Sequence, residues 1–218
     1  MTRPTGPVWG VVLAAGAGGR FGASKQFARA GGSRLVDLAV AATASSCDRV
    51  VVVLPAGRAW DGAAVDETVE GGSTRGASLR RALAVIPEAA PITVVHQAAN
   101  PLASAELFEA VIGAVRAGAP AAVPGLRPPD VVRRVAGDHV TELVGRDDLV
   151  VVQTPGAFRT EVLRRAHAAG REAAEDTALV FALGEPVGVV AGDPRNVHVT
   201  TPDELDMVNS LLQGARSG

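Results

Sequence analysis

The chain has 218 residues, of which 47% are hydrophobic and 20% are charged, and its formal net charge is −2. This length fits one large domain with a substantial core, and the composition excludes wholesale disorder. Acidic and basic residues are interspersed, which argues against nucleic acid or an anionic membrane as the main partner. The single cysteine, Cys47, excludes an internal disulfide and a multi-cysteine metal site, and we expect it to be buried as a small hydrophobic residue.

Two features of the sequence indicate a cytoplasmic location. Gly, Pro or charged residues interrupt every strand-like segment, so no apolar run reaches the length of a transmembrane helix. The N-terminal residues MTRPTGP include a cation but no apolar stretch that ends at a cleavage site. We therefore expect a cytoplasmic protein without a membrane partner.

A predicted buried strand over residues 9–13 ends in a loop of small residues, and two cations, Arg20 and Lys25, follow. A loop without bulky side chains lets backbone N–H groups approach a ligand closely and form an anion-binding concavity. Arginine offers a planar fork and lysine a mobile point charge, and both suit a polyphosphate. The alternative is an ordinary glycine-rich turn, but two cations at this spacing favour a polyphosphate loop.

Two well-known phosphate loops are excluded by spacing. The dinucleotide fingerprint G-x-G-x-x-G, started at Gly16, requires a glycine where Phe21 stands. A Walker loop requires Gly-Lys-Ser/Thr, whereas Lys25 follows Ser24 and precedes Gln26. The loop must therefore belong to another class.

Strand-like and helix-like segments alternate along the rest of the chain. Helices are expected over 34–46, 58–65, 77–86, 104–117 and 159–169, and two more begin at 175 and 201. Strands are expected over 49–54, 92–95, 121–124, 150–153, 187–190 and 197–199. This order predicts one α/β domain over residues 7–213, with a mostly parallel sheet covered by helices on both sides. Ligands bind beyond the carboxyl ends of such strands, where the loops after Leu13, Val95 and Val123 are expected to meet.

One region differs from this alternation. Between residues 127 and 149, apolar residues alternate with charged ones, and Gly137-Asp138 stands between two strand-like halves. This pattern predicts a β-hairpin arm that projects from the body.

Four segments, in this order, resemble one protein family. The run from Val11 to Phe27, VVLAAGAGGRFGASKQF, resembles the loop A-A-G-x-G-x-R-x-G-x-x-x-K-Q of nucleotidyltransferases that activate sugar and polyol phosphates. A G-G-x-x-R-x-x-S segment from Gly71 to Ser78, a Q-T-P segment and a T-T-P segment follow. Together they look most like the 2-C-methyl-D-erythritol 4-phosphate cytidylyltransferase family, to about Val208. The resemblance implies a Rossmann-like three-layer fold and a homodimer formed through the arm.

The resemblance also implies a reaction, in which CMP passes from CTP to 2-C-methyl-D-erythritol 4-phosphate and pyrophosphate leaves, within the non-mevalonate isoprenoid pathway. Mg²⁺ is the expected cofactor. Arg20 and Lys25 would contact the triphosphate, Ser78 would read the cytosine edge, and Arg75 would hold its own loop in place. The implied nucleotide-binding residues are Leu13, Ala14, Ala15, Gly16, Gly18, Gly19, Gly71, Gly72, Ser73, Ser78, Gln97 and Ala98.

The implied acceptor site departs from the family pattern. Gln97 replaces the aspartate of H-D-A-A-R-P, and because an amide neutralises no charge on Mg²⁺, we assign no metal ligand. Asn100 replaces an arginine that contacts the acceptor, and Val131 replaces a threonine on the arm. His198 replaces a catalytic lysine, and a neutral imidazole cannot supply that fixed charge at pH 7.

Other acceptor features match the family. Arg146 corresponds to the arm arginine that crosses to the partner subunit and binds the acceptor phosphate, and Thr154 lies in the Q-T-P segment. Glu175-Asp176 matches an acidic pair, for which stabilisation of a helix N-terminus is an alternative role. Three hypotheses stay open: the family reaction, a paralogue with a different phosphorylated acceptor, and a nucleotide-binding protein without turnover.

Overall fold

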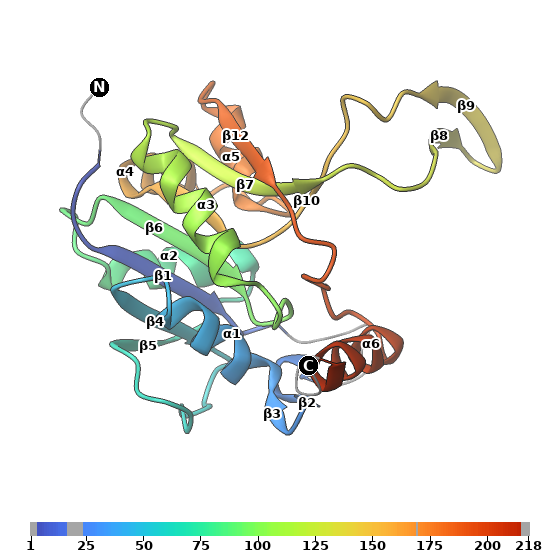
Figure 1. The fold of residues 1–218 in the computed structure, drawn as a ribbon. Coiled ribbons are helices and arrows are strands. Elements are labelled where there is room, and N and C mark those ends of the chain that lie inside the picture. Colours follow the sequence, from blue (N-terminus) through green and yellow to red (C-terminus); the bar gives the residue numbers. More distant parts are fainter. Residues whose placement is uncertain (1–3, 17–23, 169, 215–218) are drawn as a thin grey trace.

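The structure is a computed structural model that describes residues 4–16, 24–168 and 170–214. Its centre is an eight-stranded sheet with the order β10-β7-β11-β6-β1-β4-β5, in which β12 also pairs with β7 (Figure 1). These strands are β1 (Val8–Leu13), β4 (Arg49–Leu54), β5 (Glu67–Glu70), β6 (Ile92–Gln97), β7 (Ala121–Leu126), β10 (Val151–Val152), β11 (Gly156–Arg159) and β12 (Val187–Ala191). The predicted mostly parallel α/β sheet is confirmed, with β10 and β11 as the antiparallel exceptions.

Helices cover both faces of this sheet. The helical segments are η2 (Lys25–Phe27), α1 (Leu35–Ala44), α2 (Arg75–Val85), α3 (Ala105–Arg116), α4 (Thr160–Ala168), α5 (Asp176–Ala182) and α6 (Pro202–Gly214). Val11 of β1 packs in a cluster with residues of α2, α4 and α5, whereas the next residue, Val12, packs in a cluster with α1. Because successive side chains of a strand point to opposite faces, a continuous run of valines can serve both layers.

The strand β1 occupies the middle of the fold. It pairs in parallel with β4 on one side and with β6 on the other. The parallel direction brings the carboxyl ends of all three strands to one edge of the sheet. Figure 1 shows α6, at the end of the chain, beside the small hairpin of β2 (Arg29–Ala30) and β3 (Ser33–Arg34) near this edge. The predicted meeting of the loops after Leu13 and Val95 is thereby confirmed.

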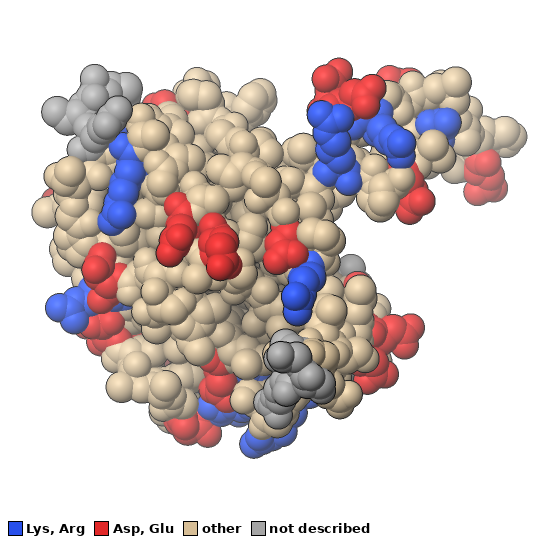
Figure 2. All heavy atoms as spheres, in the orientation of Figure 1, with Lys and Arg blue, Asp and Glu red and all other residues tan. Residues whose placement is uncertain are grey.

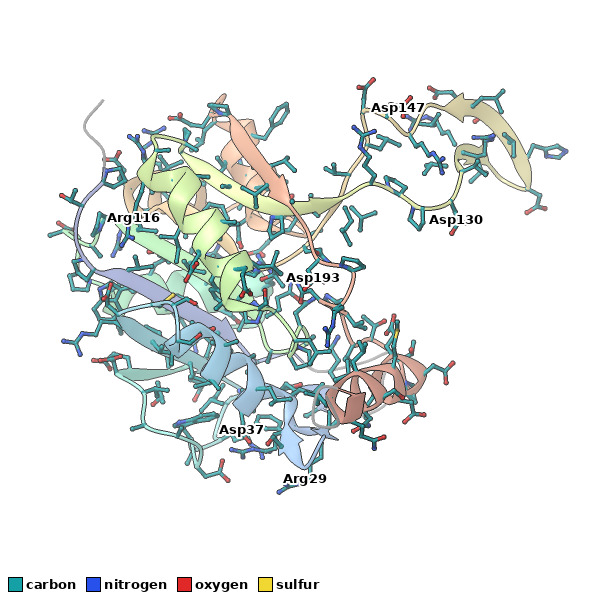
Figure 3. All side chains as sticks on the ribbon, in the orientation of Figure 1. Arg29, Asp37, Arg116, Asp130, Asp147 and Asp193 are labelled. Atoms are coloured by element: carbon teal, nitrogen blue, oxygen red, sulfur yellow. The ribbon has the colours of Figure 1, made fainter. Side chains whose placement is uncertain are left out.

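The predicted arm is present. It consists of β8 (Val132–Ala136) and β9 (His139–Val144), which pair with each other and extend away from the body (Figure 1). Figure 2 shows acidic and basic side chains side by side along it, and Figure 3 places Asp130 and Asp147 on it. Leu143 is 76% exposed, so the arm presents apolar as well as charged side chains to its surroundings.

Two of the expected elements are wrong. Residues 58–65 form an irregular loop instead of a helix, because side chains hold it: Trp60 Nε1 donates to Ala63 O at 2.7 Å, and Arg58 lies over the Phe27 ring. The loop leads into the exposed edge strand β5, which the sequence did not predict. Residues 197–199 form no strand: Val199 N donates to Ala99 O and Val197 N donates to Arg195 O, and these bonds do not make a ladder with another strand in the described part of the protein.

Other expectations hold. Cys47 is buried, and burial raises the pKa of its thiol to about 12, in agreement with a packing role. None of the helices in the described part of the chain is long and apolar enough to cross a membrane.

We predict that replacing Gly10 by a larger residue destabilises the protein. A Cβ at Gly10 would lie 2.2 Å from Thr43 Cγ2 of α1, so Gly10→Val would have to push helix and strand apart. Such overpacking costs about 1–3 kcal/mol. Urea unfolding measures this loss. Gly113→Ala in α3 is the control, since nothing lies within 4 Å of the added carbon, and helix propensity should make it about 0.5–1 kcal/mol more stable. Equal stability of both variants would contradict the prediction.

Candidate functional site

A cavity of about 700 Å³ lies at the carboxyl edge of the central strands. We call it the main cavity. Its wall is formed by Leu13, Ala14, Ala15, Gly16, Lys25, Gln26, Gly72, Ser73, Thr74, Arg75, Ser78, Gln97, Ala98, Ala99, Ala174, His198 and Thr200. Most of the predicted nucleotide-binding residues therefore converge here from three separate parts of the chain, at residues 13–16, 72–78 and 97–98. Gly18, Gly19 and Arg20 lie outside the described residues.

The loop after β1 is fixed by a buried glutamine. Gln26 Nε2 donates to Ala14 O at 2.7 Å and to Gly16 O at 3.0 Å. Because this side chain occupies the carbonyl groups of the loop, a bound anion meets little competition from them. Although Gln26 belongs to the signature loop, the sequence analysis gave it no role.

A second loop abuts the first. A Cβ on Gly71 would lie 2.2 Å from Ala15 Cβ, so a glycine is required where the two loops meet. Ser78 Oγ donates to Thr74 O at 2.8 Å and accepts from Gly72 N at 3.0 Å. The hydroxyl proton is thus engaged, and Ser78 can offer a ligand a lone pair but no donor.

Lys25 and His198 reach the cavity from opposite ends of the chain. Lys25 Nζ donates to Val199 O at 2.7 Å, which brings the ammonium to the segment that contains His198 and Thr200. Glu204 stabilises the same segment, because its carboxylate accepts a hydrogen bond from Thr200 N. The carboxylate also accepts one from Thr201 N, at 2.8 Å. These hydrogen bonds outweigh the effect of desolvation and lower the pKa of Glu204 to about 2.

The charge of the main cavity suits an anion. Among its described wall residues, the cationic side chains are Lys25 and Arg75, and no Asp or Glu side chain is present. Asp176 offsets the charge of Arg75, but no carboxylate of the described wall faces the cavity, so the wall favours a negatively charged ligand.

The same donor set does not fit a protein-held Mg²⁺. Gln97 offers an uncharged amide, and the described residues contain no cluster of three or more His, Cys, Asp or Glu that could hold a metal ion. Two carboxylates that follow in sequence from the wall residue Ala174 already have partners: Glu175 accepts from Thr177 N at 2.8 Å, and Asp176 pairs with Arg75 at 2.6 Å. Hard divalent cations prefer charged oxygen ligands, which this wall does not provide.

A second cavity of about 140 Å³ shares Arg75, Gln97 and His198 with the main cavity. It also contacts two of the predicted acceptor residues, Asn100 and Thr154. The other two, Val131 and Arg146, are on the arm and line neither cavity within a single chain, and Arg146 Nη1 donates to Pro129 O at 2.7 Å.

Buried polar bonds hold the wall of this second cavity. His96 Nε2 lies 3.0 Å from Asn100 O and must donate to it, and Nδ1 of the neutral ring lies 3.2 Å from the Thr154 hydroxyl, which also donates to Val95 O at 3.1 Å. Asn100 Nδ2 donates to Asn196 Oδ1 at 3.3 Å. The Asn100 amide is thus a buried structural group and does not extend into the cavity as an arginine would.

Gln153 of the Q-T-P segment reaches the chain after β12. Its Nε2 donates to Asp193 O at 2.8 Å, and its Oε1 accepts from Asp193 N at 3.0 Å. Asp193 lies where the chain leaves the sheet toward α6 (Figure 3). Gln153 therefore holds the start of the segment that brings His198 to both cavities.

Comparison with known proteins agrees with this geometry. The sequence model described as IspD: 2-C-methyl-D-erythritol 4-phosphate cytidylyltransferase matches residues 8–214. The chain belongs to this family. It is therefore a member of a family of nucleotidyltransferases, and the predicted resemblance is confirmed.

Individual relatives show how closely the chain follows the family. The 2-C-methyl-D-erythritol 4-phosphate cytidylyltransferase of Nocardia farcinica is 40% identical over 95% of this chain and 94% of its own length. The crystal structure of the enzyme of that name from Thermus thermophilus superposes with a TM-score of 0.82 at 34% identity, over 93% of this chain and 98% of that one. A bifunctional enzyme from Solidesulfovibrio magneticus is 35% identical, and the match covers 55% of its length.

We predict that His96 makes stability depend on pH. Burial lowers the pKa of His96 from 6.5 to about 3, so the folded protein keeps the ring neutral while the unfolded chain protonates it. The unfolded state therefore binds more protons between these values, and stability falls as the pH drops from about 6.5 toward about 3. Urea unfolding between pH 7 and pH 5 measures the slope. His96→Gln, which does not titrate, should have a flatter slope, and identical slopes would refute the assignment.

Proposed function

We propose that the chain binds CTP in the main cavity and transfers CMP to 2-C-methyl-D-erythritol 4-phosphate with release of pyrophosphate. Membership of the cytidylyltransferase family supports this proposal. The observation that carries it is the main cavity, which combines a glycine-rich loop, Lys25 and a described wall without carboxylates. A protein of this kind acts in isoprenoid precursor synthesis, and we propose a cytoplasmic location.

The reaction joins two anions. An oxygen of the acceptor phosphate attacks the α-phosphorus of CTP, a new O–P bond forms, and the bond between the α- and β-phosphates breaks with its electron pair on pyrophosphate. Catalysis of such a step rests on positioning and on cations that offset the developing charge. We assign this role to Lys25 and to Arg20, which lies outside the described residues. Mg²⁺ remains a prediction from the family, and no step here depends on it.

Ser78 supports a preference for cytosine. Its hydroxyl can accept one more hydrogen bond but has no proton to donate, because that proton is engaged with Thr74 O. The exocyclic amino group of cytosine is a donor, whereas uracil has a carbonyl acceptor at the same place. We therefore propose that the site binds CTP in preference to UTP.

The acceptor side leaves a second candidate. Gln97, Asn100 and His198 are uncharged where the family has charged residues, and Asn100 is buried in bonds to Asn196. Two acceptors are compatible with these features. One is the family acceptor, with Arg146 of a partner subunit binding its phosphate, and the other is a different phosphorylated polyol. The third possibility is binding without turnover.

Calorimetric titration with CTP, followed by a pyrophosphate-release assay with 2-C-methyl-D-erythritol 4-phosphate, tests the proposal. We expect both binding and release in the wild type. Lys25→Ala should weaken CTP binding at least about tenfold, because it removes a charge-assisted phosphate contact, and Arg20→Ala should do the same. Arg29→Ala also removes one cation, but from outside both cavities, and should leave affinity unchanged. If Lys25→Ala bound CTP as the wild type does, the assignment of the loop would fail.

Binding without release would favour another acceptor or a silent protein. The variant Gln97→Asp with Asn100→Arg and His198→Lys restores the family charges and separates these two cases. New turnover of 2-C-methyl-D-erythritol 4-phosphate would identify the chain as an altered enzyme, and continued inactivity of the folded variant would oppose that view.

We also propose a homodimer formed through the arm, as the exposed Leu143 and the position of Arg146 suggest. Leu143→Asp should give monomers in sedimentation experiments at micromolar concentration, because it places a charge on the proposed contact surface. Phe181→Asp is the matched control: Phe181 on α5 is also 76% exposed but lies outside the arm, so the dimer should persist. A monomeric wild type would disprove the proposal.

A further inference from the structure

A buried chain of polar groups lies behind the main cavity. Two hydrogen bonds of 2.6 Å join the Arg75 guanidinium to the Asp176 carboxylate. His167 Nε2 lies 3.1 Å from Asp176 Oδ1. The three residues come from α2, α5 and α4, which pack on the same face of the sheet (Figure 1). None of the steps assigned above uses His167.

The geometry determines what His167 does in this chain. A carboxylate can only accept, so Nε2 carries the proton and donates it to Asp176. His167 Nδ1 is buried and has no hydrogen-bond partner among the described residues, so the bond to Asp176 is the side-chain contact that the ring makes there. His167 is therefore a donor that orients the carboxylate. Burial alone would raise the pKa of Asp176, but the hydrogen bonds from His167 and Arg75 outweigh it and keep the pKa low.

Arg75 links this buried chain to the ligand site. Its side chain is 27% exposed and lines both cavities, whereas the Asp176 side chain is 3% exposed. Arg75 is the first residue of α2, directly after the loop residues Gly72, Ser73 and Thr74 that line the main cavity. A shift of the guanidinium would therefore move the loop that faces the ligand.

A second carboxylate fixes the same helix end. Glu172 Oε1 accepts from Arg80 Nη2 at 2.8 Å, and Glu172 Oε2 accepts from Gly76 N at 3.3 Å. A Cβ at Gly76 would lie 2.6 Å from Glu172 Oε2, so the close contact requires glycine. Two acids four residues apart in sequence, Glu172 and Asp176, thus hold two successive residues of α2.

We propose that His167 and Asp176 are positioning residues: through Arg75 they hold the Gly72–Thr74 loop in the shape that binds the nucleotide. The inference rests on the proposed function, since it requires a nucleotide in the main cavity. It assigns to the α4–α5 region a part in nucleotide affinity, although neither His167 nor Asp176 belongs to the glycine-rich loops.

Calorimetry with CTP on three variants tests this. His167→Leu fills the space but removes the donor, and we expect CTP to bind about tenfold more weakly because the loop loses its preorganisation. His167→Gln can place an amide N–H near the position of Nε2 and should restore affinity to within about twofold of the wild type. Thr43→Val is the matched control, since it removes a buried 2.8 Å hydrogen bond to Ala39 O on the opposite face and should leave affinity unchanged.

Thermal unfolding of each variant establishes that it is folded. If His167→Leu does not fold, Asp176→Asn is measured instead. This variant keeps the volume of the side chain but not its charge, and we expect the same loss of CTP affinity. Wild-type affinity in the folded variant would overturn the positioning role while the proposed function stands. An equal loss in Thr43→Val would also overturn it, because the effect would then follow stability alone. Absence of CTP binding by the wild type would overturn the proposed function and this inference together.

Discussion

The parallel pairing of β1 with β4 and β6 is the constraint on which the rest of the structure depends. All three strands are buried on both faces, so their backbone groups must be satisfied by neighbouring strands, and β1 finds both of its neighbours in β4 and β6. The shared direction brings the loops after Leu13 and Gln97 to one edge, where they form most of the main cavity together with the loop after β5, which runs parallel to β4. The site is thus made of chain turns whose positions the sheet determines, and it needs few specialised side chains.

The two halves of the site use different chemistry. The nucleotide half relies on backbone groups held by Gln26 and Ser78 and on the charge of Lys25. The proposed acceptor half includes His96 and Asn100, whose Nε2 and Nδ2 atoms are engaged within the protein. Because amides replace charged residues in that half, the affinity for the acceptor depends less on electrostatics. The shape of the cavity and contacts with hydroxyl groups then matter more for which acceptor binds.

Local signals in the sequence indicated the two loops that line the main cavity. Small residues after a buried strand indicated the first loop, and the spacing from Gly71 to Ser78 indicated the second, because both depend on close backbone approach. The sequence also indicated the arm by its alternation. The sequence did not predict β11, because this strand is short and its position depends on pairing with β6 on one side and β7 on the other. Nor did it indicate His167 or Ala174, since their positions depend on how α4 and α5 pack against α2, far away in sequence.

The contact between Lys25 and Val199 has a consequence for biosynthesis. Leu13 and Thr200 stand on the same cavity wall, and the Lys25 ammonium joins the first loop to the segment before α6. During translation, the β1 loop leaves the ribosome long before the residues that complete the wall beside it. The cavity as described here therefore cannot form on the nascent chain until Thr200 has been synthesised, however early the central strands have paired.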